Sequence, residues 1–157
     1  MKSIKLFLMF VAMFFSNSFT YAQLADEKNL TLSGAETIIS AAKSEAKANN
    51  WNVIIAVVDD GGHLLALQRM DDAQIGSIDI AIKKAKTALA FKRPTKVFDD
   101  YVKKRPSLLA INDAMMLEGG IPIIYGGKVI AAVGVSGVTS QQDAQIAEAG
   151  IKALKLD

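Results

Sequence analysis

Apolar residues recur along this chain with two different periods, which divide it into helices and paired strands. Where they return every three or four positions, as Ala35, Ile38 and Ala42 do, they form the buried stripe of an α-helix. Pro94 ends one such stretch, because its ring disfavours helical geometry in the residue before it. The helices expected on this basis cover residues 30–50, 77–91, 96–104 and a last segment from 140 onward, with one further helical turn within 107–117.

Two of these helices have candidate N-terminal caps. Ser33 and Glu36 have the spacing of a capping box near the start of the first helix. Ser140 and Asp143 have the same spacing at the start of the last one. We therefore expect these serines to cap the two helices.

Continuous apolar runs, rich in β-branched residues, predict the strands and are typical of strands buried on both faces. Residues 59–62 (Asp-Asp-Gly-Gly) and Gly126-Gly127 separate the runs in pairs, and glycine provides the positive φ that tight hairpin turns require. The sequence thus predicts an α/β (α+β) domain of three layers, profilin-like, in which helices cover an antiparallel sheet of two hairpins. The expected strands are residues 51–58 and 64–70, then 121–125 and 128–135.

The first 22 residues have the pattern of a secretory signal peptide. Two lysines open the segment, residues 6–15 are all apolar, and Thr20-Tyr21-Ala22 places small residues where a signal peptidase cleaves. The apolar run would span about 15 Å as a helix, about half of a bilayer core. We therefore expect cleavage after Ala22, a single mature domain over residues 23–157 without membrane insertion, and a periplasmic or secreted location.

Composition narrows the classes of function. The 135 residues after the leader form one domain of ordinary size and contain no cysteine, which excludes disulfides and thiolate chemistry. Their sixteen basic and sixteen acidic residues balance, so the chain has no electrostatic footprint for nucleic acid. A net charge near zero also does not oppose self-association.

No catalytic signature is present in the sequence. It has no nucleophile elbow, no phosphate loop and no metal-binding pair of histidines. The adjacent aspartates at 59–60 and 71–72 are ordinary turn residues. Whether the protein catalyses a reaction stays open, and we expect binding rather than turnover.

Short motifs follow one another in register along the mature chain. They are Val57-Val58-Asp59-Asp60-Gly61-Gly62-His63-Leu64, Arg69-Met70-Asp71-Asp72-Ala73, Ser77, Ala81, Lys83-Lys84-Ala85, Thr87-Ala88, Phe91-Lys92-Arg93-Pro94-Thr95, Gly119-Gly120-Ile121-Pro122-Ile123, Gly134-Val135-Ser136-Gly137 and Gln142-Asp143-Ala144-Gln145-Ile146-Ala147. Together they resemble the GlcG/HbpS family of haem-degrading domains, over about residues 30–154. The resemblance implies a profilin-like fold, homo-oligomers and, in characterised branches, haem binding. Related domains occur beside corrinoid-processing enzymes.

Candidate ligands for haem iron are few. His63, the only histidine, follows the first hairpin turn, and imidazole is a common axial donor to iron; the alternative is an exposed turn residue. One subunit therefore cannot supply bis-histidine ligation. Tyr125 could present its phenol at a pocket rim beside Gly126-Gly127. Further possible donors, of a type that more often fills a core, are Met70, Met115 and Met116.

Two arginines are the candidate charges for an anionic ligand. Arg69 and Arg93 each end an apolar segment, and a guanidinium suits carboxylates such as haem propionates or an organic acid. The alternative is an ion pair with Asp71, Asp72 or Asp143. Phe91 could wall an apolar cleft nearby.

Three functions stay open at this point. The first is an exported, oligomeric protein that binds a tetrapyrrole, haem, in an apolar pocket with basic edges. The second is a small organic-acid binding protein, or an enzyme of the glycolate-utilisation type, with a small polar cleft near Arg93. The third is a sensor or assembly partner whose function lies in an exposed apolar surface.

Overall fold

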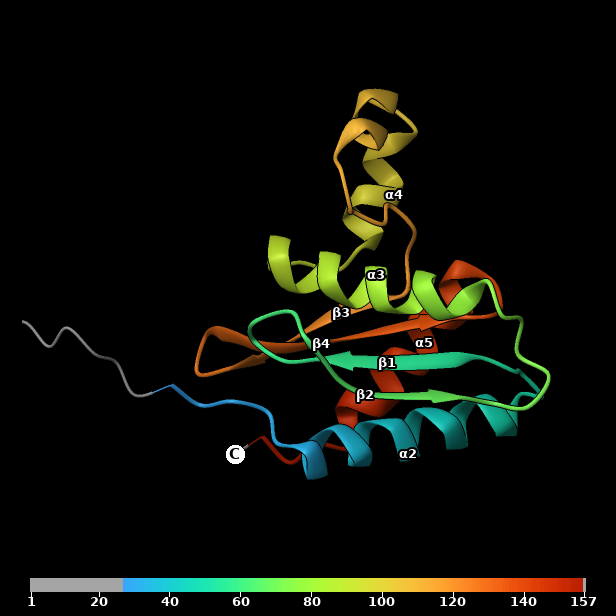
Figure 1. Ribbon diagram of the computed structural model, residues 1–157, viewed down its shortest axis with the longest axis vertical. Helices are drawn as coiled ribbons and strands as arrows, with labels where there is room; N and C mark the ends of the chain where they lie inside the picture. Colours follow the sequence, from blue (N-terminus) through green and yellow to red (C-terminus); the bar gives the residue numbers. More distant parts are fainter. Residues whose placement is uncertain (1–26, 157) are drawn as a thin grey trace, which may run out of the picture.

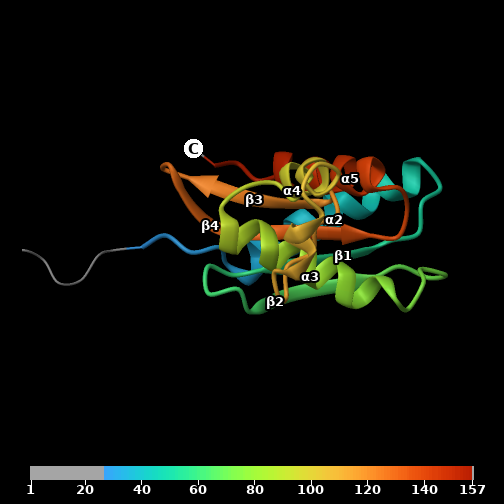
Figure 2. The ribbon, with the colours of Figure 1, turned by 90° about the horizontal axis from the view of Figure 1, so that it is seen from above.

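The computed structural model describes residues 27–156 and forms an α+β domain of three layers (Figures 1 and 2). Its elements are α2 (Leu32–Ala48), β1 (Ile54–Val58), β2 (Leu64–Arg69), α3 (Ser77–Phe91), α4 (Lys96–Val102), the 3₁₀ helix η1 (Pro106–Ala110), β3 (Gly120–Tyr125), β4 (Lys128–Ser136) and α5 (Ser140–Lys152). The sheet lies between α3 on one face and the pair α2 and α5 on the other. The expected leader, residues 1–22, lies outside the described residues.

All four strands pair antiparallel, in the order β2-β1-β4-β3. Each predicted hairpin is present, and the two join through β1 and β4, which pair from Ile54 opposite Ser136 to Val58 opposite Ala132. The central strands are therefore covered on both faces, which explains their continuous apolar runs. Strands β2 and β3 form the two edges of the sheet.

The larger core lies between the sheet and helices α2 and α5. Alternate residues of the central strands, such as Ile55, Val57 and Val133, pack there against Ile38 of α2 and Ile146 of α5, and all five side chains are fully buried. Burying an aliphatic side chain of this size stabilises a fold by about 1.5–3 kcal/mol. This layer therefore dominates the hydrophobic stabilisation of the domain.

Helix α3 approaches the opposite face closely because two glycines lie beneath it. A Cβ atom at Gly134 of β4 would overlap the carbonyl oxygen of Ala81, and one at Gly120 of β3 would overlap the carbonyl oxygen of Lys84. The facing helix positions are also small, notably Ala81 and Ala85. Helix and sheet backbones can meet at this distance only where side chains are absent or short.

Residues 96–118 extend away from the sheet as an arm, as Figure 1 shows for α4 and the segment after it. Phe98 is buried as expected, but Tyr101, which the pattern placed inward, is 53% exposed because the arm stands clear of the main core. The expected helical turn occurs as η1, and Met116 is buried while Met115 is half-buried.

Both predicted helix caps are wrong by one or two residues. Thr31 caps α2, since its hydroxyl accepts the Gly34 N–H at 3.2 Å. Thr139 caps α5 in a full capping box with Gln142, so that Ser140 is the first helical residue. Both threonines have the extended backbone that an N-cap requires. The shift in α5 leaves the carboxylate of Asp143 available for a different partner.

The predicted three-layer domain with its two-hairpin sheet is confirmed. Helix α3 has the predicted bounds, whereas the strand expected over 51–58 begins only at Ile54. Within residues 27–156, no helix combines the length and the apolar character that crossing a membrane requires.

Candidate functional site

The turn between β1 and β2 presents His63 to solvent. The Asp59 carboxylate accepts the His63 N–H at 2.8 Å, and the His63 carbonyl accepts the Asp59 N–H at 2.9 Å. Gly62 takes the positive φ of 79° that closes the turn. The imidazole is exposed, so the backbone of the turn is fixed while the ring stays free to contact a ligand.

The turns of the two hairpins meet at one cavity, which we call the hairpin-end pocket. Tyr125, the last residue of β3, is half-buried in it and packs against the larger core. Asp60, from the same turn as His63, contributes to its wall. Its volume is about 190 Å³, and it is lined by Glu27, Lys28, Asn29, Asp60, Tyr125, Gly126, Lys128, Val129 and Ile130.

Charged groups surround this pocket without closing it. Lys128 Nζ lies 3.8 Å from a carboxylate oxygen of Glu27, and both side chains are exposed. An exposed ion pair at this distance contributes little to stability, so both groups can reorient toward a ligand. The pocket therefore combines apolar walls with two lysines, Lys28 and Lys128, and two carboxylates, Glu27 and Asp60.

The end of α3 lies against the same turn from the other face of the sheet. A Cβ atom at Gly62 would be 3.5 Å from a methyl carbon of Leu89, two residues before Phe91. The Phe91 ring packs edge-to-face on Phe98, with 5.0 Å between the ring centroids. The Arg93 Nε–H donates to the Phe91 carbonyl at 3.1 Å, and its side chain is exposed. Phe91 and Arg93 thus lie at the base of the arm.

Arg69 lies at the opposite end of β2, about 20 Å from His63 at the rise of an extended strand. No ion pair joins it to Asp71, Asp72 or Asp143 in the part of the chain that the structure describes. Arg69 instead lines a cavity of about 310 Å³ between α2 and the end of β2. The cavity is lined by Lys43, Lys47, Asn52, Gln68, Arg69, Met70, Asp71 and Asp72.

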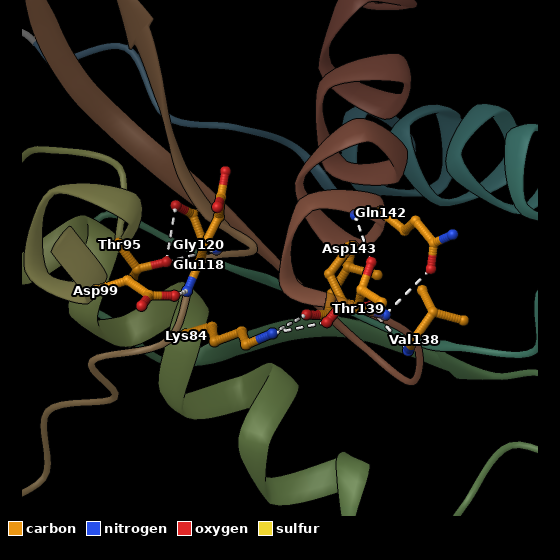
Figure 3. A network of polar contacts seen from close by, with 10 residues as sticks. Lys84, Thr95, Asp99, Glu118, Gly120, Val138, Thr139, Gln142 and Asp143 are labelled. Atoms are coloured by element: carbon orange, nitrogen blue, oxygen red, sulfur yellow. Dashed lines mark hydrogen bonds and ion pairs between the residues drawn. The ribbon is translucent and has the colours of Figure 1, made fainter. Parts of the chain in front are cut away.

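A buried polar network lies where β3 begins and β4 ends (Figure 3). Lys84 Nζ of α3 donates to Asp143 of α5 at 2.8 Å and to the Val135 carbonyl at 3.0 Å. Burial raises the pKa of the Asp143 carboxyl above its ordinary value, against the opposing effect of the Lys84 ammonium. The Asp143 carboxylate also accepts the Val138 N–H at 3.2 Å.

Thr95 continues this network along the outer side of β3. Its hydroxyl accepts the Gly120 N–H at 2.9 Å, and its own N–H donates to the Gly120 carbonyl at 2.9 Å. The Asp99 carboxylate accepts the Glu118 N–H at 3.0 Å. The Thr95–Gly120 bonds therefore hold the start of the arm against β3, and the Asp99–Glu118 bond joins the two ends of the arm to each other (Figure 3).

A small cleft, which we call the β3-edge cleft, opens beside this network. Its volume is about 170 Å³, and its walls are mostly backbone and apolar groups of Gly119, Gly120, Ile121 and Ala144. The charged side chains Lys96, Glu118 and Glu148 stand around it, and Arg93 is not among the lining residues. The organic-acid hypothesis placed a small polar cleft near Arg93; this cleft is small, and its rim carries two carboxylates that would repel an acid.

The structure thus gathers some of the sequence-predicted residues and separates others. His63, Tyr125 and Phe91 lie toward the end of the domain that holds the hairpin turns, whereas Arg69 lies at the other end of β2.

The sequence pattern predicts no functional role for Lys84, although this residue falls on the buried stripe of Ala81, Ala85 and Ala88. A charged residue on an apolar helix face is the signal that identifies such a buried ion pair. Within residues 27–156 no cluster of three metal-binding side chains occurs.

Comparisons with known proteins agree with this architecture. A family model described as haem degrading protein HbpS-like matches residues 30–152. Protein GlcG of Escherichia coli (strain K12) is 47% identical over 103 residues, which cover 65% of this chain and 77% of GlcG.

Two solved structures share the fold closely. A double mutant of Streptomyces reticuli HbpS superposes with a TM-score of 0.79 at 33% identity, over 87% of this chain and 94% of HbpS. A PduOC:haem complex superposes with a TM-score of 0.76 at 27% identity, over 83% of this chain and 98% of that one. Since the family match covers nearly all of the described domain, the chain belongs to the HbpS-like family of haem-degrading proteins.

Proposed function

We propose that this protein is exported to the periplasm and binds haem at the hairpin end of its sheet, as a homo-oligomer. Membership of the HbpS-like family and similarity to a PduOC:haem complex support haem as the ligand. One observation carries the placement of the ligand: Tyr125 lines the hairpin-end pocket together with Asp60, which lies three residues before His63 in the same turn, although His63 itself is not a lining residue. Imidazole and phenol are both established donors to haem iron.

The residues of the hairpin-end pocket fit the chemistry of haem. Val129 and Ile130 offer an apolar wall to a macrocycle, and Lys28 and Lys128 offer ammonium groups to its propionates, with Glu27 as a competing partner of Lys128 and Asp60 as a second carboxylate of the pocket. When bound, haem would supply the iron centre, with Tyr125 or His63 as its protein ligand. Because His63 is exposed, its imidazole can turn toward the iron without disturbing the core.

The size of the pocket supports the oligomeric part of the proposal. Pockets that enclose a small molecule usually measure about 300–1,000 Å³, and this one measures about 190 Å³. One subunit would therefore hold one edge of the macrocycle, and a second copy would cover the rest.

A haemin titration of residues 23–157, followed by absorbance, tests the proposal. We expect a saturable, shifted Soret band that is lost in one of the two variants His63→Ala and Tyr125→Phe. Tyr101→Phe is the matched control, since Tyr101 lies in α4, is exposed, does not line the pocket and loses the same hydroxyl. An unsaturable response, or a band that survives in both donor variants, contradicts haem ligation at this end of the sheet.

The haem-loaded protein also tests turnover, and expression of the full chain tests export. Addition of a reductant in air, with catalase present to remove peroxide, should move the Soret band to its ferrous position and keep its intensity, whereas a loss faster than that of free haemin would show that the protein degrades haem. Expression of the full 157-residue chain in a Gram-negative host should place protein lacking residues 1–22 in the periplasmic fraction. Full-length protein confined to the cytoplasm would contradict export.

A small carboxylate is the second candidate ligand, on a different observation. Arg69, Lys43 and Lys47 line one cavity of about 310 Å³, together with the amides of Asn52 and Gln68. The three cations outnumber the two carboxylates of the cavity, Asp71 and Asp72, so the set can pair with and orient an organic acid. A melting temperature that rises with glycolate in the wild type, but not in Arg69→Ala, would favour this candidate over haem.

A further inference from the structure

The outer edge of strand β3 is closed to further pairing. Along an antiparallel ladder, main-chain groups point alternately toward the partner strand and away from it. The Val135 N–H donates to the Gly119 carbonyl, so the main-chain groups of Gly119 point toward β4. The main-chain groups of Gly120 and Pro122 therefore point away from β4, toward the outer edge. Thr95 hydrogen-bonds to both the N–H and the carbonyl of Gly120, and Pro122 has no N–H to donate. A further strand therefore finds no free donor at the start of this edge.

The outer edge of β2 has no such protection. The Met70 N–H donates to the Val53 carbonyl at 3.0 Å, so the main-chain groups of Met70 point toward the β1 side. The main-chain N–H and C=O groups of Leu67 and Arg69 therefore point away from β1. No residue within 27–156 hydrogen-bonds to these outward groups. The strand contains no proline, and Leu64 at its start is 48% exposed. Proteins normally block or cover such an edge, so an open one indicates a pairing partner.

The surface beside β2 is complementary to itself under a two-fold rotation. Two cavities of about 310 Å³ each share Lys43 and Gln68 and together follow α2 and β2 along this edge. Glu36 lines only the cavity nearer the start of α2, whereas Lys47, Arg69, Asp71 and Asp72 line only the other. A two-fold axis across the edge reverses the second copy, so that Glu36 of each copy faces the part of the other groove that holds Lys47 and Arg69.

We propose that two copies of this chain pair β2 with β2, antiparallel, about a two-fold axis near Leu67, and so form one continuous eight-stranded sheet. The occupant of this edge is a second copy rather than an unrelated peptide, because the rotation places Glu36 of one copy opposite Lys47 and Arg69 of the other. The inference rests on the oligomeric part of the proposed function and names the surface that forms the oligomer.

This pairing completes the ligand site across the interface. In a single subunit Arg69 and His63 lie about 20 Å apart, at opposite ends of β2. With the axis at Leu67, the partner subunit's Arg69 lies opposite Leu65, two residues or about 7 Å along the strand from His63. A guanidinium from the partner thus reaches the end of the sheet at which we place the haem.

Sedimentation velocity of residues 23–157 over a range of concentrations tests the pairing. We expect a dimer, or a larger assembly built from dimers, for the wild type. The informative variant is Arg69→Pro, which removes an outward N–H without breaking the ladder to β1, and Arg69→Ala is its matched control. We expect the dissociation constant of the dimer to rise at least 100-fold in Arg69→Pro and less than tenfold in Arg69→Ala.

Amide hydrogen exchange in the wild type gives a readout that does not depend on a variant folding. The outward N–H groups of Leu67 and Arg69 should be protected from exchange in the assembled protein and lose that protection on dilution below the dissociation constant. A monomer at all concentrations, an Arg69→Pro dimer as stable as the wild type, or rapid exchange at both amides overturns the pairing. A monomer whose β2 amides become protected only on adding an extended peptide assigns the edge to a peptide instead.

The haemin titration separates this inference from the proposed ligand. A monomer that still shows a saturable Soret band overturns the β2 pairing and leaves haem binding intact. A β2-paired dimer without a Soret band keeps the interface and contradicts haem.

Discussion

Lys84 and Asp143 form a buried ion pair between helices that lie on opposite faces of the sheet. Their charged atoms are 2.8 Å apart, and each side chain is only 2% exposed. The pair passes the start of β3 because residue 119 is glycine: a Cβ atom there would lie 2.8 Å from Lys84 Nζ. One polar contact thus ties the α3 layer to the α5 layer around the end of the sheet (Figure 3).

Removal of one partner from this pair should cost more stability than removal of both. Asp143→Ala should lower the free energy of unfolding by about 3–5 kcal/mol, because it leaves an ammonium buried without a counter-charge. The double variant Lys84→Met/Asp143→Leu should regain most of that loss, since it replaces the charges with apolar groups. Urea denaturation measures both. Asp100→Ala, which breaks the exposed pair with Lys96, is the control and should change stability little.

The titration of Asp143 should make its contribution to stability fall as pH rises. Because burial raises its pKa in the folded protein above the ordinary value of 3.8, the folded state binds more protons than the unfolded state between those two values. The stability that wild type has over Asp143→Asn should therefore be largest below pH 3.8 and decrease as pH rises from there through the raised pKa of the folded state. An advantage that grows with pH would instead mean that the Lys84 ammonium outweighs burial and lowers the pKa.

Most of the fold follows from patterns that involve only neighbouring residues. The period of Ala81 and Ala85 predicts α3, and Gly126-Gly127 predicts the second hairpin, because helix and turn geometry are local properties. The order of the strands is also restricted, since two hairpins must share one sheet. The predicted caps miss the true ones by one or two residues because Ser and Thr are both good N-cap residues, and Thr139 directly precedes Ser140 in the chain.

Much less of the candidate site could be predicted, since it depends on contacts between distant segments. The spacing of Lys84 and Asp143 in the chain gives no indication that they meet, because the sheet between them decides their geometry. The approach of Asp60 to Tyr125 likewise needs both hairpins in place. Arg69 and His63 are close in sequence yet lie at opposite ends of one strand, because an extended chain separates what a helix would bring together.

The identity of the α5 cap can be checked by two neighbouring substitutions. Thr139→Ala should lower the free energy of unfolding by about 1 kcal/mol, because it removes the hydroxyl that accepts the Gln142 N–H. Ser140→Ala should have little effect, since Ser140 makes no capping bond in the structure. Thermal denaturation of the two variants distinguishes these sites. A larger loss for Ser140→Ala would restore the cap that the sequence pattern predicts.

The close contact between α3 and the sheet makes Gly134 the least replaceable of the small residues at this interface. A methyl group there would overlap the Ala81 carbonyl oxygen, and backbone cannot move aside as a flexible side chain can. Gly134→Ala should therefore lower the free energy of unfolding by about 3 kcal/mol, at the upper end of what overpacking costs.

Gly76→Ala is the matched control for Gly134→Ala: its Cβ would meet no atom within 4 Å, and its φ of −59° suits any residue. Urea denaturation should place this control within about 0.5 kcal/mol of wild type. Equal stability of the two variants would mean that α3 can shift away from the sheet without cost, and the Lys84–Asp143 pair, which is anchored on the same helix, would then lengthen in Gly134→Ala.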